Sequence, residues 1–161
     1  LFRSLRPFIK SNIYNRIITQ NPIQIKQGME KENTEISGIR ILVVEDDKIN
    51  QFLNKKILLK MGFDADVASD SDEAIQKLAN QHFDLVLMDL RLPGKDGIEI
   101  TRIIRQMDKP ISEIPVFAIT SSVAFTVRQE AEVAGINEYF TKPYNANELK
   151  EMILKYIDRR N

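Results

Sequence analysis

Several apolar runs in this sequence end on side chains that carry a charge or a hydroxyl group. Leu85–Met88 is one such run, and it leads directly into Asp89 and then into a Pro-Gly turn. An apolar run of this length predicts a buried strand, so the carboxylate at its end requires an explanation. The other runs end in acids, hydroxyl residues or a lysine, namely Glu45, Asp46 and Asp47, then Thr120, Ser121 and Ser122, then Lys142 before Pro143.

The chemistry that suits this set of residues is phosphoryl transfer to a carboxylate. Carboxylates placed together repel one another unless a cation lies among them. With no histidine or cysteine nearby, the ligands are all oxygen atoms, which favours Mg²⁺. A carboxylate beside Mg²⁺ can attack a phosphoryl group. A threonine hydroxyl and a lysine ammonium can then donate hydrogen bonds to the phosphoryl oxygens.

The elements that must bring these residues together alternate between strand and helix. We predict strands at residues 39–45, 64–69, 83–89, 114–120 and 136–141, and helices at 48–62, 71–80, 97–107, 125–135 and 145–160. This alternation predicts an α/β fold, a doubly wound five-stranded parallel sheet covered by helices on both faces. Ligands bind such sheets at the carboxyl ends of the strands, where all the residues above would meet.

Local signals support the first two helices. Helical spacing in the first comes from four apolar residues, Ile49, Phe52, Leu53 and Ile57. Gly62 is expected to end that helix in a left-handed conformation. Asp70 and Glu73 are expected to form a capping box at the start of the second helix.

Charge and composition limit the remaining possibilities. The chain has 161 residues, a formal net charge of zero and no cysteine. Its total charge therefore gives no sign of nucleic-acid binding, and disulfides and cysteine-ligated zinc are excluded. No apolar run is long enough to cross a membrane.

The charge of the N-terminal part differs from that of the rest, because residues 1–27 are basic and contain no acid. We predict an N-terminal extension or linker at residues 1–38, with an amphipathic helix in it, and one domain at residues 39–161.

The predicted domain resembles a response-regulator receiver, the phosphoacceptor module of two-component signalling. The matching stretches are "ILVVEDDKIN", "DLVLMDLRLPGKDG", "VFAITS" and "YFTKPY". The resemblance spans residues 39–158 and is specific as a set. It implies a flavodoxin-like sheet with the strand order 2-1-3-4-5.

The resemblance also implies a role for individual residues. Asp89 would be phosphorylated, and Thr120 and Lys142 would hold the phosphoryl oxygens. The implied Mg²⁺ ligands are Asp46, Asp89 and the main-chain carbonyl of Arg91, with Glu45 acting through water. Lys142–Pro143 would be a cis peptide. Tyr139 would be the aromatic residue that moves inward together with Thr120 when the domain switches. Without the resemblance, Tyr139 is interpreted as a half-buried strand residue with its hydroxyl in water.

The implied partners follow from the same resemblance. A histidine kinase or a histidine phosphotransfer protein would donate the phosphoryl group, and a downstream partner would bind the face formed by residues 125–135, 136–141 and 145–160. The chain would be cytoplasmic, and the receiver itself would contact neither nucleic acid nor membrane. Two contexts are open, a stand-alone regulator and the C-terminal receiver of a hybrid histidine kinase, and the second is favoured. As a receiver it would catalyse only its own phosphorylation and dephosphorylation. The alternative is an aspartate-based, Mg²⁺-dependent phosphatase of the dehalogenase type.

Overall fold

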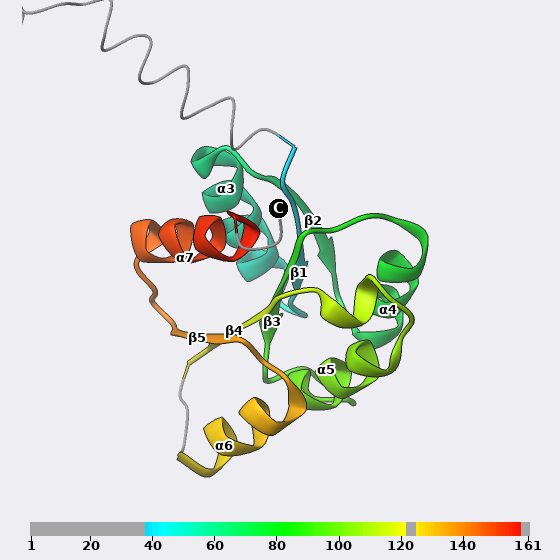
Figure 1. Cartoon of the computed structure of the whole chain (residues 1–161). Coiled ribbons are helices and arrows are strands. Elements are labelled where there is room, and N and C mark those ends of the chain that lie inside the picture. The colour runs from blue at the N-terminus through cyan, green and yellow to red at the C-terminus, as the bar shows by residue number, and fades with distance from the viewer. Residues whose placement is uncertain (1–37, 122–124, 159–161) are drawn as a thin grey trace, which may run out of the picture. The chain divides into compact units, whose positions relative to one another are not determined.

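The computed structural model describes residues 38–121 and 125–158 (Figure 1). The amphipathic helix predicted in the N-terminal extension lies outside these residues. The elements are β1 (Arg40–Val44), α3 (Lys48–Met61), β2 (Asp64–Ala68), α4 (Ser71–Asn80), β3 (Leu85–Asp89), α5 (Gly97–Gln106), the 3-10 helix η1 (Ile111–Glu113), β4 (Val116–Thr120), α6 (Phe125–Ala134), β5 (Glu138–Thr141) and α7 (Ala146–Asp158).

The five strands form one parallel sheet in the order β2-β1-β3-β4-β5. In Figure 1, α3 and α7 lie on one side of this sheet, and α4, α5 and α6 lie on the other. The predicted fold class and strand order are therefore confirmed. Within the described residues, no helix is both long and apolar enough to cross a membrane.

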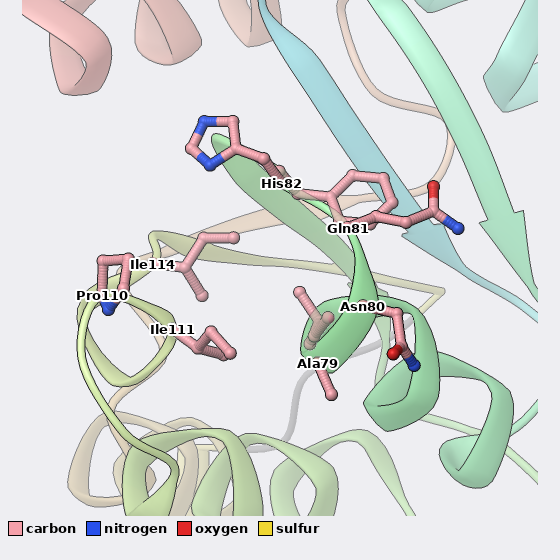
Figure 2. Close-up of a pocket in the computed structure, with 9 residues that line it drawn as sticks. Ala79, Asn80, Gln81, His82, Pro110, Ile111 and Ile114 are labelled. Atoms are coloured by element: carbon pink, nitrogen blue, oxygen red, sulfur yellow. The ribbon is translucent and has the colours of Figure 1, made fainter.

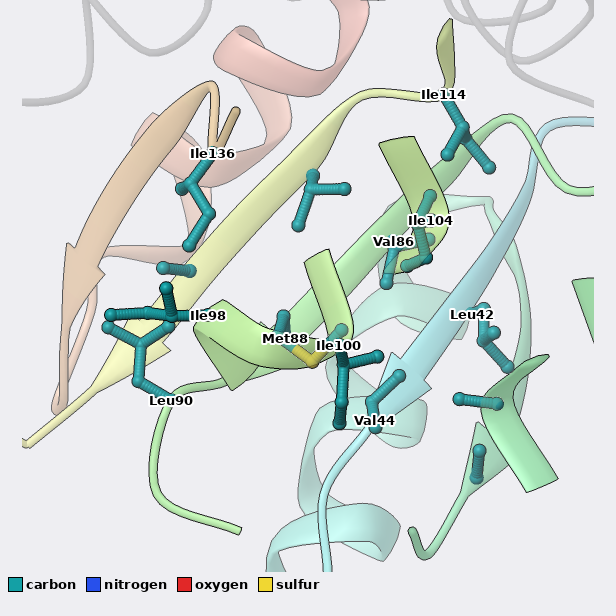
Figure 3. Close-up of a cluster of buried hydrophobic side chains, with 14 of the residues drawn as sticks. Leu42, Val44, Val86, Met88, Leu90, Ile98, Ile100, Ile104, Ile114 and Ile136 are labelled. Carbon is teal, nitrogen blue, oxygen red and sulfur yellow. The ribbon is translucent and has the colours of Figure 1, made fainter. Parts of the chain in front are cut away.

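The core follows from the strand sequences. β3 and β4 are buried along their whole length, as expected for strands covered on both faces. Figure 3 shows the part of the core in which Val86 and Met88 of β3 pack with Ile100 and Ile104 of α5. Burying side chains of this size stabilises the fold by about 1.5–3 kcal/mol each.

Two of the predicted helix caps can be compared with the structure. Gly62 has φ 97° and ends α3 in the left-handed conformation, as predicted. At α4, Asp70 accepts a hydrogen bond from the Glu73 N–H (2.9 Å). Glu73, however, accepts from the N–H of Ser69 (2.8 Å) and not from that of Asp70. The predicted capping box is therefore only half right. The Glu73 carboxylate binds the N–H of Ser69, the residue before the cap, and not the N–H of the cap residue Asp70.

Helix α3 forms where predicted but buries a different set of residues. Its buried side chains are Gln51, Asn54 and Leu58. Two of the apolar residues that gave the helical spacing, Phe52 and Leu53, are 58% and 49% exposed. The side of α3 that faces the domain is thus largely polar.

Candidate functional site

The register of the sheet brings the predicted site residues to one edge. In the pairing of β1 with β3, Val44 lies opposite Met88, so Glu45 and Asp89 follow at the same level. Thr120, the last residue of β4, lies opposite Thr141 of β5. Lys142 comes directly after that pair, and its N–H donates to the Thr120 carbonyl (2.8 Å).

Lys142 joins two of the acids. Its Nζ donates to Oδ2 of Asp89 at 2.6 Å and to Oε2 of Glu45 at 2.7 Å. Both carboxylates are buried, with Glu45 2% and Asp89 9% exposed. Burial lowers the pKa of Lys142, but its hydrogen bonds to Asp89 and Glu45 raise that pKa by more, so the net pKa lies above the ordinary lysine value. The lysine therefore carries its positive charge between the two acids.

Further contacts orient each carboxylate. Oδ1 of Asp89 accepts the N–H of Arg91 at 2.9 Å. On the other acid, Oε1 of Glu45 accepts from Nδ2 of Asn50 at 3.2 Å. The main-chain carbonyl of Glu45 accepts from Nε2 of Gln51 at 2.5 Å. Asn50 and Gln51 lie on the first turn of α3, and neither was predicted as a site residue. Their place directly after the acids in "EDDKINQ" was the available signal.

The other two acids that follow β1, Asp46 and Asp47, occupy different surroundings. Asp46 is exposed and borders a hollow of about 610 Å³ that Arg91 and Thr120 also line. Asp47 caps α3, because its Oδ1 accepts from the N–H groups of Ile49 (2.9 Å) and Asn50 (2.8 Å). Asp47 is therefore a helix cap beside the site.

The donor atoms around this hollow suit a hard cation. Asp46 and Arg91 line it, and Asp89 immediately precedes the lining residues Leu90 and Arg91. Carboxylate and main-chain carbonyl oxygens are the ligand type that Mg²⁺ prefers. Within residues 38–121 and 125–158, no three acidic or histidine side chains are gathered closely enough to hold a metal by themselves. Two of the acids are instead bridged by Lys142. The oxygen ligands offered by these residues fit Mg²⁺ in chemistry.

Thr120 and Tyr139 lie on the neighbouring strands β4 and β5, and Thr120 lines the hollow. Thr120 is 1% exposed. Tyr139 is half-buried, its hydroxyl donates to the carbonyl of Arg128 in α6 (3.2 Å), and the Arg128 guanidinium lies 5.3 Å from the centre of its ring. Burial and the nearby Glu132 carboxylate raise the pKa of Tyr139 to about 12, against a smaller lowering by Arg128. The hydroxyl therefore contacts the α6 main chain.

The peptide bond between Lys142 and Pro143 is cis, as the resemblance implied, and so is that between Lys109 and Pro110.

A second hollow, of about 300 Å³, lies before the amino end of β3 (Figure 2). Its lining includes the apolar Pro110, Ile111 and Ile114, and His82, whose side chain is 70% exposed. It contains no carboxylate and is therefore unsuited to phosphoryl chemistry on an acid.

Comparisons with known proteins agree with this geometry. The family model described as response regulator receiver domain matches residues 41–154. The autoinducer 2 sensor kinase/phosphatase LuxQ of Vibrio vulnificus is 35% identical over 119 residues, which are 74% of this chain and 14% of that protein. Hybrid signal transduction histidine kinase G of Dictyostelium discoideum is 30% identical over 133 residues, 81% of this chain and 4% of that protein. The chain thus spans a small part of these relatives.

Among solved structures, the receiver domain of sensor histidine kinase PA1611 from Pseudomonas aeruginosa is 32% identical, with a TM-score of 0.69. The match covers 76% of this chain and 99% of that domain, which is described with a magnesium ion coordinated in its active site cleft. The Francisella response regulator 1452 receiver domain matches with a TM-score of 0.69, 27% identity, and coverage of 77% and 100%. The family model, the strand order and the edge that carries Asp89 and Lys142 together place this chain in the response regulator receiver domain family.

Proposed function

We propose that Asp89 accepts a phosphoryl group from a phosphohistidine in a two-component phosphorelay. One observation carries this proposal. The Asp89 carboxylate stands at the end of β3, held by Lys142 at 2.6 Å and by the Arg91 N–H at 2.9 Å. The two residues that follow it, Leu90 and Arg91, line the same hollow as Thr120. The contact between a nucleophile and an ammonium donor, close in sequence to residues that share a hollow with the Thr120 hydroxyl, supports this proposal. The dehalogenase-type phosphatase finds no support in the family match.

In the proposed reaction, a carboxylate oxygen of Asp89 forms a bond to phosphorus while the bond from phosphorus to the histidine nitrogen breaks. The electron pair of the broken bond goes to the imidazole, which takes a proton from water. Lys142 and Thr120 donate hydrogen bonds to the phosphoryl oxygens, where charge is spread in the transition state. Hydrolysis of the acyl phosphate by water returns Asp89 to its starting state.

The residues proposed to hold Mg²⁺ are Asp46, Asp89 and the main-chain carbonyl of Arg91, with Glu45 acting through water. When bound, the ion supplies positive charge that offsets the repulsion between the carboxylate and the phosphoryl oxygens. Lys142 contributes part of this charge from the protein itself. Its ammonium contacts both buried acids at 2.6 and 2.7 Å.

The phosphodonor proposed here is a histidine kinase or a histidine phosphotransfer protein that docks on α3. A donor histidine must reach Asp89. The surfaces beside the carboxyl edge of the sheet would therefore contact the donor protein. α3 starts at this edge and exposes Phe52 and Leu53. It contains four lysines and no acid, in the sequence KINQFLNKKILLKM. A partner with apolar and acidic side chains around its histidine fits this face, whereas a second copy would bring like charges together.

The downstream partner is proposed to bind the face formed by α6, β5 and α7. Tyr139 of β5 contacts α6 through Arg128, so a shift of Thr120 toward a phosphoryl group would change this face through Tyr139. We also propose that the domain works in the cytoplasm as the C-terminal receiver of a hybrid histidine kinase, with residues 1–38 as an extension or linker. The name of one relative, a hybrid signal transduction histidine kinase, supports the hybrid-kinase part of this proposal.

The test is phosphorylation of the purified chain by phosphoramidate with Mg²⁺, followed by intact-mass measurement. The wild type should gain one phosphoryl group. This group should be lost in acid, as an acyl phosphate is, whereas a phosphoserine would survive. Asp89→Asn should gain none. Asp64→Asn, which changes an exposed aspartate at the start of β2, should behave as the wild type. Uptake of acid-labile phosphate by Asp89→Asn would assign the acceptor elsewhere.

A further inference from the structure

The polar face of α3 holds the site from two directions. Asn50 and Gln51 contact the carboxylate and the carbonyl of Glu45. One turn further along the same face, Oδ1 of Asn54 accepts a hydrogen bond from the hydroxyl of Tyr144 at 2.7 Å. Asn54 is only 6% exposed, so this bond also satisfies a buried amide oxygen. The helix thereby contacts both the β1 end and the loop that leaves β5.

That loop carries Lys142. The main chain of Lys142 is fixed at the end of β5 by its N–H contact with the Thr120 carbonyl (2.8 Å). Beyond it, Tyr144 is the next side chain that ties the loop to the body of the domain. Burial raises the pKa of the Tyr144 phenol, while the charge of Lys142 lowers it and that of Glu45 raises it. The ring therefore lies within electrostatic reach of the site.

We propose that Tyr144 and Asn54 are positioning residues, whose hydrogen bond holds the loop after β5 so that the Lys142 ammonium stays directed at Asp89. This inference rests on the proposed function, because its effect is on phosphoryl transfer. Lysine is a point charge on a flexible stem of four carbons. Its alignment therefore depends on where its main chain is held. Charge stabilisation in the transition state is effective only when the donor is already in position.

The alternative is a purely structural role, in which the hydrogen bond from Tyr144 satisfies the buried Asn54 oxygen and stabilises the fold without affecting Lys142. The two roles differ in whether the effect needs Lys142. A positioning effect disappears once the lysine is gone, whereas a general loss of stability persists in its absence. A double-mutant cycle between Tyr144 and Lys142 separates the two cases.

The test measures the rate of Asp89 phosphorylation by phosphoramidate with Mg²⁺ in the full chain. Tyr144→Phe, which removes only the hydroxyl, should slow phosphorylation by about three- to tenfold, the range expected for one neutral hydrogen bond. Asn54→Leu should slow it similarly, and the double variant should be no slower than either. Tyr156→Phe is the matched control, because its hydroxyl binds Glu138 (2.9 Å), away from the site, and its rate should match the wild type.

The decisive comparison uses a Lys142→Met background, in which Tyr144→Phe should cause no further slowing. A wild-type rate for Tyr144→Phe would overturn the inference and leave the proposed function standing. The same slowing with and without Lys142 would also overturn it, since the tyrosine would then act only through stability. Absence of any phosphate on wild-type Asp89 would overturn the proposed function and this inference together.

Discussion

Lys142 is the cation that allows two acids to be buried at one end of the sheet, and its removal should destabilise the domain. The perturbation is Lys142→Met, which keeps an unbranched stem and deletes the charge. Glu45 and Asp89, with side chains 2% and 11% exposed, then lose the only ammonium that the described residues place in contact with both. Their remaining donors, Asn50 Nδ2 and the Arg91 N–H, are neutral. Burial lowers the pKa of Lys142 and its hydrogen bonds to the two acids raise it by more. Its stabilising contribution is therefore complete below the ordinary lysine pKa of 10.5 and is lost as the pH rises through the higher pKa of the folded state.

The magnitude follows from burial. Removing one partner of a fully buried ion pair costs about 3–5 kcal/mol. The Lys142 side chain is 24% exposed, so part of that cost is screened, and we expect about 2–3 kcal/mol. For a chain of this size, that loss lowers the melting temperature by about 4–12 °C.

The assay is thermal unfolding by circular dichroism at about pH 8, where lysine is charged, with EDTA present. Lys77→Met is the matched control. Lys77 also contacts two acids, Asp66 and Glu73, at 3.2 Å each, but their side chains are 31% and 38% exposed. Lys77→Met should lower the free energy of unfolding by about 1 kcal/mol or less. This includes the loss of a hydrogen bond from Lys77 to the main-chain carbonyl of Val67. Added Mg²⁺ should stabilise Lys142→Met more than the wild type. Equal melting temperatures for Lys142→Met and the wild type in EDTA would refute the reasoning.

Three further outcomes are expected. Thr120→Ala should still be phosphorylated but should leave the NMR shifts around Tyr139 at their unphosphorylated values when beryllofluoride and Mg²⁺ are added; wild-type shifts in that variant would remove Thr120 from the switch. Gly97→Ala should lower the free energy of unfolding by about 1–3 kcal/mol in urea titrations, because its Cβ would meet the carbonyl oxygen of Asp89. Phe52→Ser should change stability by about 0.5 kcal/mol or less and slow transfer from a phosphohistidine donor, but not from phosphoramidate; equal rates from both donors would argue against docking on α3.

Much of the fold could be predicted from local signals. The apolar runs that became β1, β3 and β4 are short and rich in branched residues, and the helices between them have clear spacing, so the parallel sheet followed. The edge that carries the site was predictable for the same reason, because every strand of a parallel sheet ends on the same side. Asp89 and Thr120 were thus placed by topology alone.

The contacts inside the site were not predictable, because they depend on tertiary distances. Lys142 is 97 residues from Glu45 and 53 from Asp89 along the chain. Nothing local specifies that its ammonium lies between the two acids. Sequence reasoning expected clustered carboxylates around a metal ion, whereas the structure adds a lysine that already bridges two of them.

Helix α3 shows most clearly that a local sequence pattern can predict a helix without predicting which of its faces is buried. Apolar periodicity identifies a helix, and it usually also identifies the buried face. Here the buried face carries Gln51 and Asn54, and the apolar Phe52 and Leu53 face solvent. Both departures have one cause, which is the position of the helix beside the phosphoacceptor edge. Its inner face must satisfy Glu45 and the loop that holds Lys142, which requires amides. Under the proposed function, its outer face lies where a phosphodonor would approach, and apolar side chains there would supply binding area that the fold itself does not use.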